Sequence, residues 1–283
     1  MLRRSHRLGE RIARLSLSGK TALVVLALIV VGGLVALVYT PYSPYAIRPY
    51  ERWLPPSLLH ICGTDGLGRD LFSRLAAGSA RTVLTSVTAV FIAITLGVLL
   101  AALIATSHRH VSGVLQRAAD LFIAFPTLLI AMLLATAFVG SSATVAAAIG
   151  LGSVSVVTRT VLPELYASVR SEHALLAQQS GASWWWIVTR HVAPDIMPTL
   201  TVRATQLLGT AILAESGLSY LGLGPQPPAP SWGRMLAEFQ PEIGVHTWPL
   251  AITAAVLLAT VISFAIVGDA LRDVFDVRLE DHS

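Results

Sequence analysis

Long apolar stretches separated by short polar segments dominate the chain. No charged residue interrupts residues 21–39 or residues 84–106. About 20 apolar residues are enough to cross the hydrocarbon core of a bilayer as a helix. Four further apolar stretches are shorter or contain glycine or proline, and they cover residues 121–139, 143–158, 200–214 and 248–267. The pattern therefore predicts an all-α polytopic membrane protein with six transmembrane helices.

A polar, helix-forming segment, residues 171–198, lies between the fourth and fifth predicted spans. Gly181 is expected to end a first helix in a left-handed conformation, and Ser183 is expected to cap a second one. Pro194 and Pro198 should prevent the second helix from running smoothly into the next span. We call residues 171–198 the bracket. We interpret the bracket as a stiff docking surface for another protein, and the alternative is a solvated loop folded on itself.

The composition agrees with a membrane protein. Of 283 residues, 54% are apolar and 13% are charged, against about 25% charged in typical soluble domains. Cys62 is the single cysteine, which excludes an intrachain disulfide and a cysteine metal cluster. No small-residue cleavage site follows the first span, so this span is expected to be a retained helix.

The basic residues are distributed unequally between the two sides of the membrane. Six spans place both termini on the side of the bracket, and this side holds Arg3, Arg4, Arg7, Arg11, Arg14, Lys20, Arg109, Arg117, Arg159, Arg170, Arg190, Arg203, Arg272 and Arg278. The other side holds Arg48, Arg52, Arg69, Arg74, Arg81 and Arg234. This bias predicts that the termini and the bracket are cytoplasmic. The net charge of +4 follows from this topology, and no nucleic-acid-binding patch is predicted.

These features divide the chain into consecutive parts. Residues 1–20 form a basic cytoplasmic N-terminus, which is expected to anchor on anionic lipid. The parts that follow are a first transmembrane helix (21–40), an extracytoplasmic segment (41–80), a five-helix core (81–268) and a cytoplasmic tail (269–283). The core includes the cytoplasmic coupling loop (163–198) and a second extracytoplasmic segment (215–246).

The first extracytoplasmic segment contains a glycine-rich motif at residues 63–70. Its candidate residues are Gly63, Thr64, Asp65, Gly68, Arg69 and Asp70. We predict a tight turn closed by an internal ion pair, with Asp70 at the N-terminus of the following helix. A phosphate-binding loop is the disfavoured alternative, because the motif lacks the glycine-lysine-serine ending and no strand precedes it.

The second extracytoplasmic segment combines aromatic residues, glycines and a proline-rich turn. Its candidate residues are Leu221, Gly222, Gly224 and Trp232. Three interpretations remain open for this segment: an aromatic belt at the membrane interface, a cap over a translocation path, or a landing surface for an external partner.

The sequence contains no pattern typical of catalysis. The eight histidines lack the His-Glu-x-x-His spacing, and no nucleophile elbow or Walker sequence is present. We therefore predict no catalytic residue, no metal site and no cofactor in this chain, so any driving energy must enter through another chain. An intramembrane enzyme is disfavoured for the same reason.

Intramembrane carboxylates raise one more alternative, an ion-coupled carrier that acts alone. Its candidates are Asp120, Glu215 and Asp269, and all three lie near the edges of predicted spans, which counts against it. Asp120 could serve as a proton relay, but ordinary solvation at the interface is favoured. Pro126 is expected to kink the third span.

The bracket resembles the cytoplasmic loop of ABC-importer permeases. Their pattern is Glu-Ala-Ala, three residues, Gly, nine residues and Ile-x-Leu-Pro. Gly181 and the segment from His191 to Pro194 fit this spacing. The Glu-Ala-Ala position is occupied by Leu175, Leu176 and Ala177, so the acidic residue is missing, and Ala193 replaces the leucine.

Three further motifs are similar to those of the C-type subunit of dipeptide/oligopeptide/nickel importer permeases. Residues 63–70 resemble Gly-Thr-Asp-x-Leu-Gly-Arg-Asp, and residues 218–224 resemble Leu-Ser-Phe-Leu-Gly-Leu-Gly. Residues 268–278 resemble the closing Gly-Asp-x-Leu-Arg-Asp stretch. The similarity runs in order over nearly the whole chain.

The resemblance implies a type I ABC-importer permease fold with a cytoplasmic coupling helix, in a bacterial plasma (inner) membrane. It implies four partners: a homologous second permease, two ATP-binding subunits that hold ATP and Mg, and an extracytoplasmic solute-binding protein. The residues implied in ATPase coupling are Leu175, Leu176, Ala177, Gly181, Ala182, Ser183, His191 and Pro194. The implied cargo is short peptides, and nickel chelates or another small solute remain the alternative.

Overall fold

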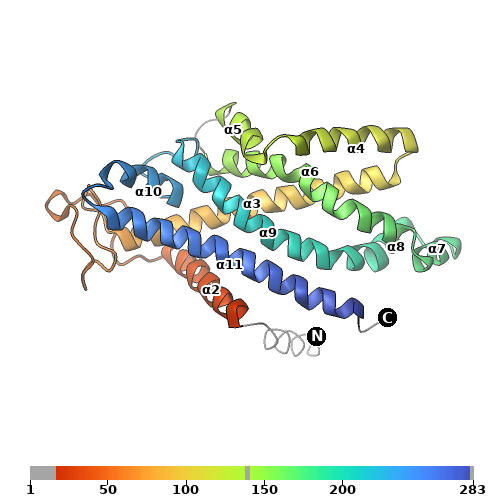
Figure 1. Cartoon of the computed structure of the whole chain (residues 1–283), viewed down its shortest axis with the longest axis horizontal. Helices are drawn as coiled ribbons and strands as arrows, with labels where there is room; N and C mark the ends of the chain where they lie inside the picture. Colours follow the sequence, from red (N-terminus) through yellow and green to blue (C-terminus); the bar gives the residue numbers. More distant parts are fainter. Residues whose placement is uncertain (1–16, 138–140, 281–283) are drawn as a thin grey trace.

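The computed structural model describes residues 17–137 and 141–280, and their regular structure is helical apart from one antiparallel bridge between Thr64 and Asp70. The long helices are α2 (Leu17–Ala36), α3 (Leu71–Thr106), α4 (Arg109–Ala124), α6 (Ser142–Val169), α9 (Ala193–Tyr220) and α11 (Thr247–Glu280) (Figure 1). The shorter ones are α5 (Thr127–Ala137), α7 (Glu172–Gln179), α8 (Trp184–Ile187) and α10 (Trp232–Phe239). Residues 1–16 of the predicted basic N-terminus lie outside the described residues. The end of the predicted third span, at Val139, also lies outside them.

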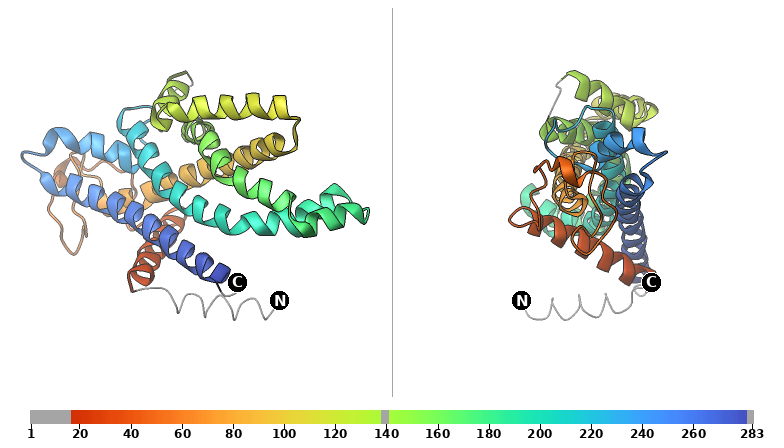
Figure 2. Two further views of the ribbon diagram at one scale, coloured as in Figure 1. Left: turned by 45° about the vertical axis from the view of Figure 1, so that its right-hand side comes forward. Right: turned by 90° about the vertical axis from the view of Figure 1, so that its left-hand side faces the viewer.

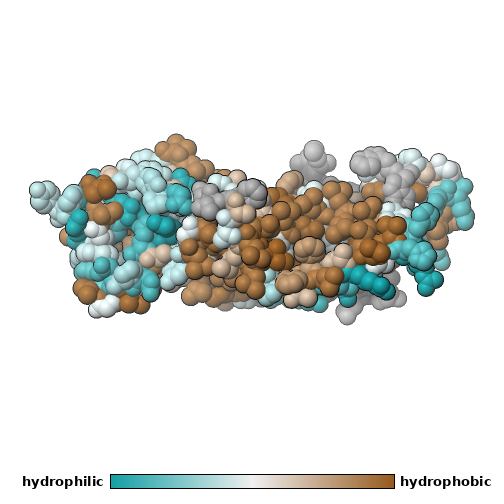
Figure 3. All heavy atoms as spheres, turned by 90° about the horizontal axis from the view of Figure 1, so that it is seen from above, coloured by the Kyte–Doolittle hydropathy of each residue, from teal (hydrophilic) through white to brown (hydrophobic). Residues whose placement is uncertain are grey.

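The helices form an elongated bundle with different elements at its two ends. The loop of residues 41–70 and α10 lie at one end, and α7 and α8 lie at the other (Figures 1 and 2). Apolar side chains gather over the middle of one face, whereas hydrophilic side chains gather at both ends (Figure 3). A central apolar band between polar ends is the surface expected of a protein that crosses a bilayer.

Close packing between α3 and α6 forms the centre of the bundle. A Cβ atom at Gly97 would lie 2.6 Å from Cβ of Val157, and one at Gly150 would lie 2.8 Å from the carbonyl oxygen of Ala89. The hydroxyl of Thr158 donates a hydrogen bond of 3.1 Å to the carbonyl oxygen of Gly97. Small residues and interhelical hydrogen bonds are the usual means by which helices associate in membranes.

The expected all-helical membrane architecture is confirmed, but within residues 17–137 and 141–280 fewer than six helices are both long and apolar enough to cross a bilayer. Among the described residues, α2, α3, α6 and α11 are, and the bent pair α4–α5 would add a fifth span. The predicted fifth span, residues 200–214, lies within α9. This helix is long enough but carries polar residues such as Arg203 and Glu215, and it packs among α3, α6 and α11.

The expected kink at Pro126 is a complete break. Helix α4 ends at Ala124, α5 begins at Thr127, and the two axes differ in direction by 88°. Phe125, which precedes the proline, has an extended backbone (φ −90°, ψ 133°). The ring of a proline disfavours the helical conformation in the preceding residue, which explains why the helix ends instead of bending.

The expected interruption at Pro194 and Pro198 was wrong. Helix α8 continues through a π-helical turn, Val188–Val192, directly into α9. The backbone N–H of Ala193 donates to the carbonyl oxygen of Val188, five residues earlier. The wider turn lies just before Pro194, which stands at the start of α9, and Pro198 lies inside α9, so the helix passes both prolines.

Candidate functional site

The bracket forms the predicted helix–glycine–helix element. The hydroxyl of Ser171 caps α7 by accepting from the backbone N–H of Ala174 at 3.3 Å. Gly181 ends the helix with φ +79°. Its N–H donates to the carbonyl oxygen of Gln178 at 3.1 Å, and the N–H of Ala182 donates to that of Ala177 at 3.0 Å. This pair of hydrogen bonds is a Schellman motif, which fixes the direction of the chain after α7.

The second arm of the bracket starts at its predicted cap. The hydroxyl of Ser183 accepts a hydrogen bond of 3.3 Å from the backbone N–H of Trp186. The ring of Trp186 meets the imidazole of His191 edge-on, with 5.3 Å between their centroids. Both contacts join residues close in sequence, as do the hydrogen bonds of the first arm, so local contacts stabilise each arm of the bracket.

The base of the bracket is anchored in the core of the bundle. Ala174, Ile187 and Val192 are buried and belong to the same apolar core as α3 and α6. At the base, the hydroxyl of Ser168 donates to the carboxylate of Asp195 at 2.6 Å, which links the end of α6 to the start of α9. The base of the bracket is therefore joined to both α6 and α9.

The tip of the bracket exposes apolar side chains. Leu175 is 45% exposed and Leu176 is 60% exposed. Of the other predicted coupling residues, Gly181, Ser183 and Pro194 are exposed, whereas Ala177, Ala182 and His191 are half-buried. Exposed leucines at the polar end of a membrane protein are typical of a protein–protein contact. The structure thus brings the predicted coupling residues together on one protruding element.

The glycine-rich motif at the other end of the bundle forms the predicted tight turn. Gly63 and Gly68 have φ values of +78° and +74°, which glycine adopts without strain. The carboxylate of Asp65 accepts from the guanidinium Nε of Arg69 at 2.7 Å, so the predicted ion pair is confirmed. Asp70 accepts from the backbone N–H of Ser73 at 2.8 Å, which confirms the predicted helix cap. The hydroxyl of Thr64 accepts from a backbone N–H of the same loop at 2.8 Å.

Two charged residues that were not predicted extend this ion pair into a buried network. Arg74 is 1% exposed and contacts both Asp65 and Glu238. Its Nη2 lies 2.7 Å from Oε2 of Glu238, and Nη2 of Arg69 lies 3.0 Å from the same oxygen. The network ties the glycine-rich loop and α3 to α10. Sequence spacing carries no signal for it, because Arg74 and Glu238 are 164 residues apart.

The second predicted motif lies at the same end as the first. The buried indole of Trp232 donates to the carbonyl oxygen of Leu75 at 3.1 Å, which holds α10 against α3. Gly222 ends α9 with φ +82°. A Cβ atom at Gly224 would lie 2.1 Å from the hydroxyl of Ser219. Leu221 is 55% exposed. It is the one exposed residue among the four that were predicted for this segment.

The three carboxylates considered for ion coupling do not form one site. Asp120 pairs with Arg159 at an exposed position, and Asp269 is exposed. Glu215 is 1% exposed within α9 and accepts a hydrogen bond of 2.7 Å from the hydroxyl of Ser219. Within residues 17–137 and 141–280, no group of three or more His, Cys, Asp or Glu side chains could hold a metal ion.

Comparison with known proteins identifies the class of membrane protein. Residues 75–281 match the family described as the binding-protein-dependent transport system inner membrane component. The chain belongs to this family. The match covers both the bracket and α10, and it agrees with the resemblance found for the sequence motifs.

Curated relatives of this permease cover most of its length. It is 32% identical over 266 residues to the probable D,D-dipeptide transport system permease of Escherichia coli K12, with 93% of this chain and 89% of that protein covered. It is also 32% identical to a glutathione transport system permease of E. coli O6:K15:H31, with 97% and 91% covered. A putative peptide permease of Brucella suis biovar 1 is 32% identical, with 83% of each chain covered.

A solved structure supports the fold of this permease. The MetNI methionine ABC transporter, in an inward-facing conformation, matches with a TM-score of 0.58 and 16% identity. The superposition covers 71% of this chain and 96% of that chain. The expected fold class, that of an ABC-importer permease, is therefore confirmed.

Proposed function

We propose that this chain is the C-type permease subunit of an ATP-driven importer for short peptides. The observation that carries the proposal is the bracket: a capped hairpin with exposed leucines, anchored in α6 and α9, at one end of a membrane bundle. Peptide cargo is supported by the names of the relatives, which are permeases of dipeptide, peptide and glutathione transport systems.

In the proposed mechanism, the bracket docks on one of two ATP-binding subunits. ATP and Mg bind to those subunits, and this chain contributes no catalytic residue and no cofactor. Closure of the ATPase pair displaces the bracket, and the anchored helices α6 and α9 move with it because rigid elements move as bodies. ATP shifts the transporter between its two states only if the docked states differ in free energy.

The remaining partners follow from the same proposal. A homologous second permease completes the path, and an extracytoplasmic solute-binding protein delivers the cargo. The charge bias supports a cytoplasmic position for the bracket and both termini, which places the Gly63–Asp70 turn and Trp232 on the side of the solute-binding protein. The missing acidic residue at Leu175 implies that docking at this position is apolar.

The test compares two substitutions at Gly181 in the complete transporter reconstituted in proteoliposomes. Gly181→Pro fixes φ near −65°, which is incompatible with the observed φ of +79°. Gly181→Asn is the matched control, because asparagine tolerates the left-handed conformation and nothing lies within 4 Å of an added Cβ.

We expect Gly181→Pro to insert in the membrane normally but to lose ATP-dependent dipeptide uptake, and Gly181→Asn to keep most of it. Uptake is measured with a radiolabelled dipeptide and ATP hydrolysis with a phosphate assay. Normal uptake by Gly181→Pro would show that the bracket does not couple the two processes. Uptake of a nickel chelate but of no peptide would instead correct the cargo alone.

A further inference from the structure

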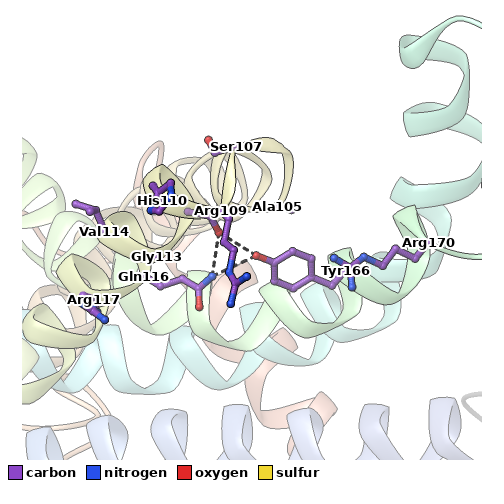
Figure 4. Close-up of a pocket in the computed structure, with 11 residues that line it drawn as sticks. Ala105, Ser107, Arg109, His110, Gly113, Val114, Gln116, Arg117, Tyr166 and Arg170 are labelled. Carbon is purple, nitrogen blue, oxygen red and sulfur yellow. Dashed lines mark hydrogen bonds between the residues drawn. The ribbon is translucent and has the colours of Figure 1, made fainter.

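A cleft of about 940 Å³ opens between α4 and the end of α6, where its lining residue Arg170 directly precedes the bracket (Figure 4). The end of α3, the first half of α4 and the end of α6 line it. The apolar parts of α3 and α6 end here, so the cleft lies at the depth expected for lipid headgroups.

The lining of this cleft is cationic. Arg109, Arg117 and Arg170 contribute guanidinium groups, His110 lies beside them, and no acidic residue is among the lining residues. In the part of the chain that the structure describes, none of these three arginines makes an ion pair. Arginine recognises phosphate through paired N–H donors. The charges of the cleft therefore favour a phosphate-bearing ligand.

The first turn of α4 carries positive charge where a helix favours negative charge. Its first turn carries Arg109 and His110 and no acidic residue, and His108 provides no side-chain cap. The N-terminus of a helix carries a partial positive charge, so basic side chains there are unfavourable. A bound anion would offset the helix dipole and the positive charge of the lining.

A network of hydrogen bonds holds the walls of the cleft together. The amide nitrogen of Gln116 donates to the hydroxyl oxygens of Ser112 at 3.1 Å and of Tyr166 at 3.2 Å. The two hydroxyl oxygens lie 3.2 Å apart, and the guanidinium of Arg170 lies 5.5 Å from the ring centroid of Tyr166 (Figure 4). The contacts of Ser112 and Gln116 with Tyr166 join α4 to α6, so the fold itself sets the separation between the two helices.

Exposed apolar side chains adjoin the cationic lining. Val114 lines the cleft and is 66% exposed. Leu103 in α3 and Val111 in α4 are 52% and 50% exposed. A soluble phosphate would leave these side chains uncovered, whereas an acyl chain would cover them. We propose that this cleft binds an anionic phospholipid, with its phosphate in the cleft that Arg109, Arg117 and Arg170 line and an acyl chain along Val114.

The test uses the full-length chain and measures lipid retention by native mass spectrometry. The wild type is expected to retain phosphatidylglycerol in preference to phosphatidylcholine. The triple variant Arg109→Gln/Arg117→Gln/Arg170→Gln should bind phosphatidylglycerol at least roughly tenfold more weakly. The control Arg48→Gln/Arg52→Gln/Arg81→Gln removes the same charge at the opposite end of the bundle and should keep the preference. Equal retention by the two triple variants would overturn the proposal.

A second measurement distinguishes binding of a lipid from binding of free phosphate. It also uses a single substitution, so the test does not depend on correct folding of the triple variant. Melting temperatures are compared in nanodiscs of phosphatidylcholine, with and without phosphatidylglycerol or inorganic phosphate. Phosphatidylglycerol should raise the melting temperature of the wild type but not of Val114→Asp, a single exposed substitution that places a carboxylate in the cleft. If inorganic phosphate alone gives the same rise, the cleft is a soluble-phosphate site and the lipid assignment is wrong.

Discussion

At the scale of single residues, Asp65 holds together the network at the end of the bundle opposite the bracket. Its side chain is 1% exposed and contacts Arg69 and the buried Arg74. We expect Asp65→Ala to lower the free energy of unfolding by about 3 kcal/mol, because the buried Arg74 loses one of its two carboxylate partners and keeps only Glu238. Thermal unfolding of the purified chain in nanodiscs measures this change.

The exposed pair Arg48–Glu51 serves as the control for that experiment. Its atoms lie 3.0 Å apart at side chains that are 42% and 36% exposed. Removal of Arg48 as Arg48→Ala should cost no more than about 1 kcal/mol, since solvent screens such pairs. Similar melting temperatures for Asp65→Ala and Arg48→Ala would show that the buried network does not stabilise the fold.

The sequence was informative about residues wherever the contact is local. The Asp65–Arg69 pair, the Asp70 cap and the left-handed Gly181 each follow from neighbours within four residues. Arg74 and Glu238 could not be paired in this way, because their contact depends on how α10 folds back onto α3. Burial of Glu215 was missed for the same reason, since it depends on the packing of α9 among its neighbours.

At the scale of elements, the close approach of α3 and α6 depends on glycine. A Cβ atom at Gly97 would lie 2.6 Å from Val157, so Gly97→Val must push the two helices apart. Overpacking of this kind costs about 1–3 kcal/mol, and we expect a lower melting temperature in detergent. Gly32→Val in α2 is the matched control, because nothing lies within 4 Å of its added Cβ. An equal loss in both variants would contradict the packing.

Helices cover most of each predicted apolar stretch in the described chain. Residues 37–39 follow the end of α2, and Phe125 and Pro126 lie between α4 and α5. At Pro126 the helix breaks, whereas at Pro194 it continues. The difference arises because the π-helical turn before Pro194 changes the hydrogen-bonding pattern, while Phe125 adopts an extended backbone. The identity of the proline alone does not decide between these outcomes.

At the scale of the whole molecule, the single cysteine offers a direct test of orientation. Cys62 is half-buried in the loop of residues 41–70, which we expect to be extracytoplasmic. Burial, followed by the negative charge of Asp70, raises the pKa of its thiol. Less of the reactive thiolate is therefore present at neutral pH, so labelling should accelerate as the pH rises. In intact cells at alkaline pH, a membrane-impermeant maleimide should label Cys62.

The control for orientation moves the cysteine to the bracket. In a Cys62→Ser background, Ser180→Cys places a thiol at an exposed position beside Gly181. This variant should be labelled only after the membrane is permeabilised. Labelling of Ser180→Cys in intact cells would reverse the assigned topology.

In the whole molecule, the predicted motifs lie at two opposite ends of the bundle (Figures 1 and 2). The external motifs, far apart in sequence, meet through Trp232 and Glu238 at one end, and the bracket protrudes from the other. Charge bias predicted which segments share a side of the membrane, because it depends only on position along the chain. It could not predict the contacts within each end or the cationic cleft, which arise when helices distant in sequence pack together.

The most direct test of the account is whether the bracket touches an ATP-binding subunit. A photo-cross-linking amino acid replaces the exposed Leu176 in the assembled transporter, and the same substitution at the exposed Leu58 serves as the control at the other end. We predict an adduct between position 176 and an ATP-binding subunit, and none from position 58. If position 176 gives no such adduct, or position 58 gives it equally, the bracket is not the coupling element.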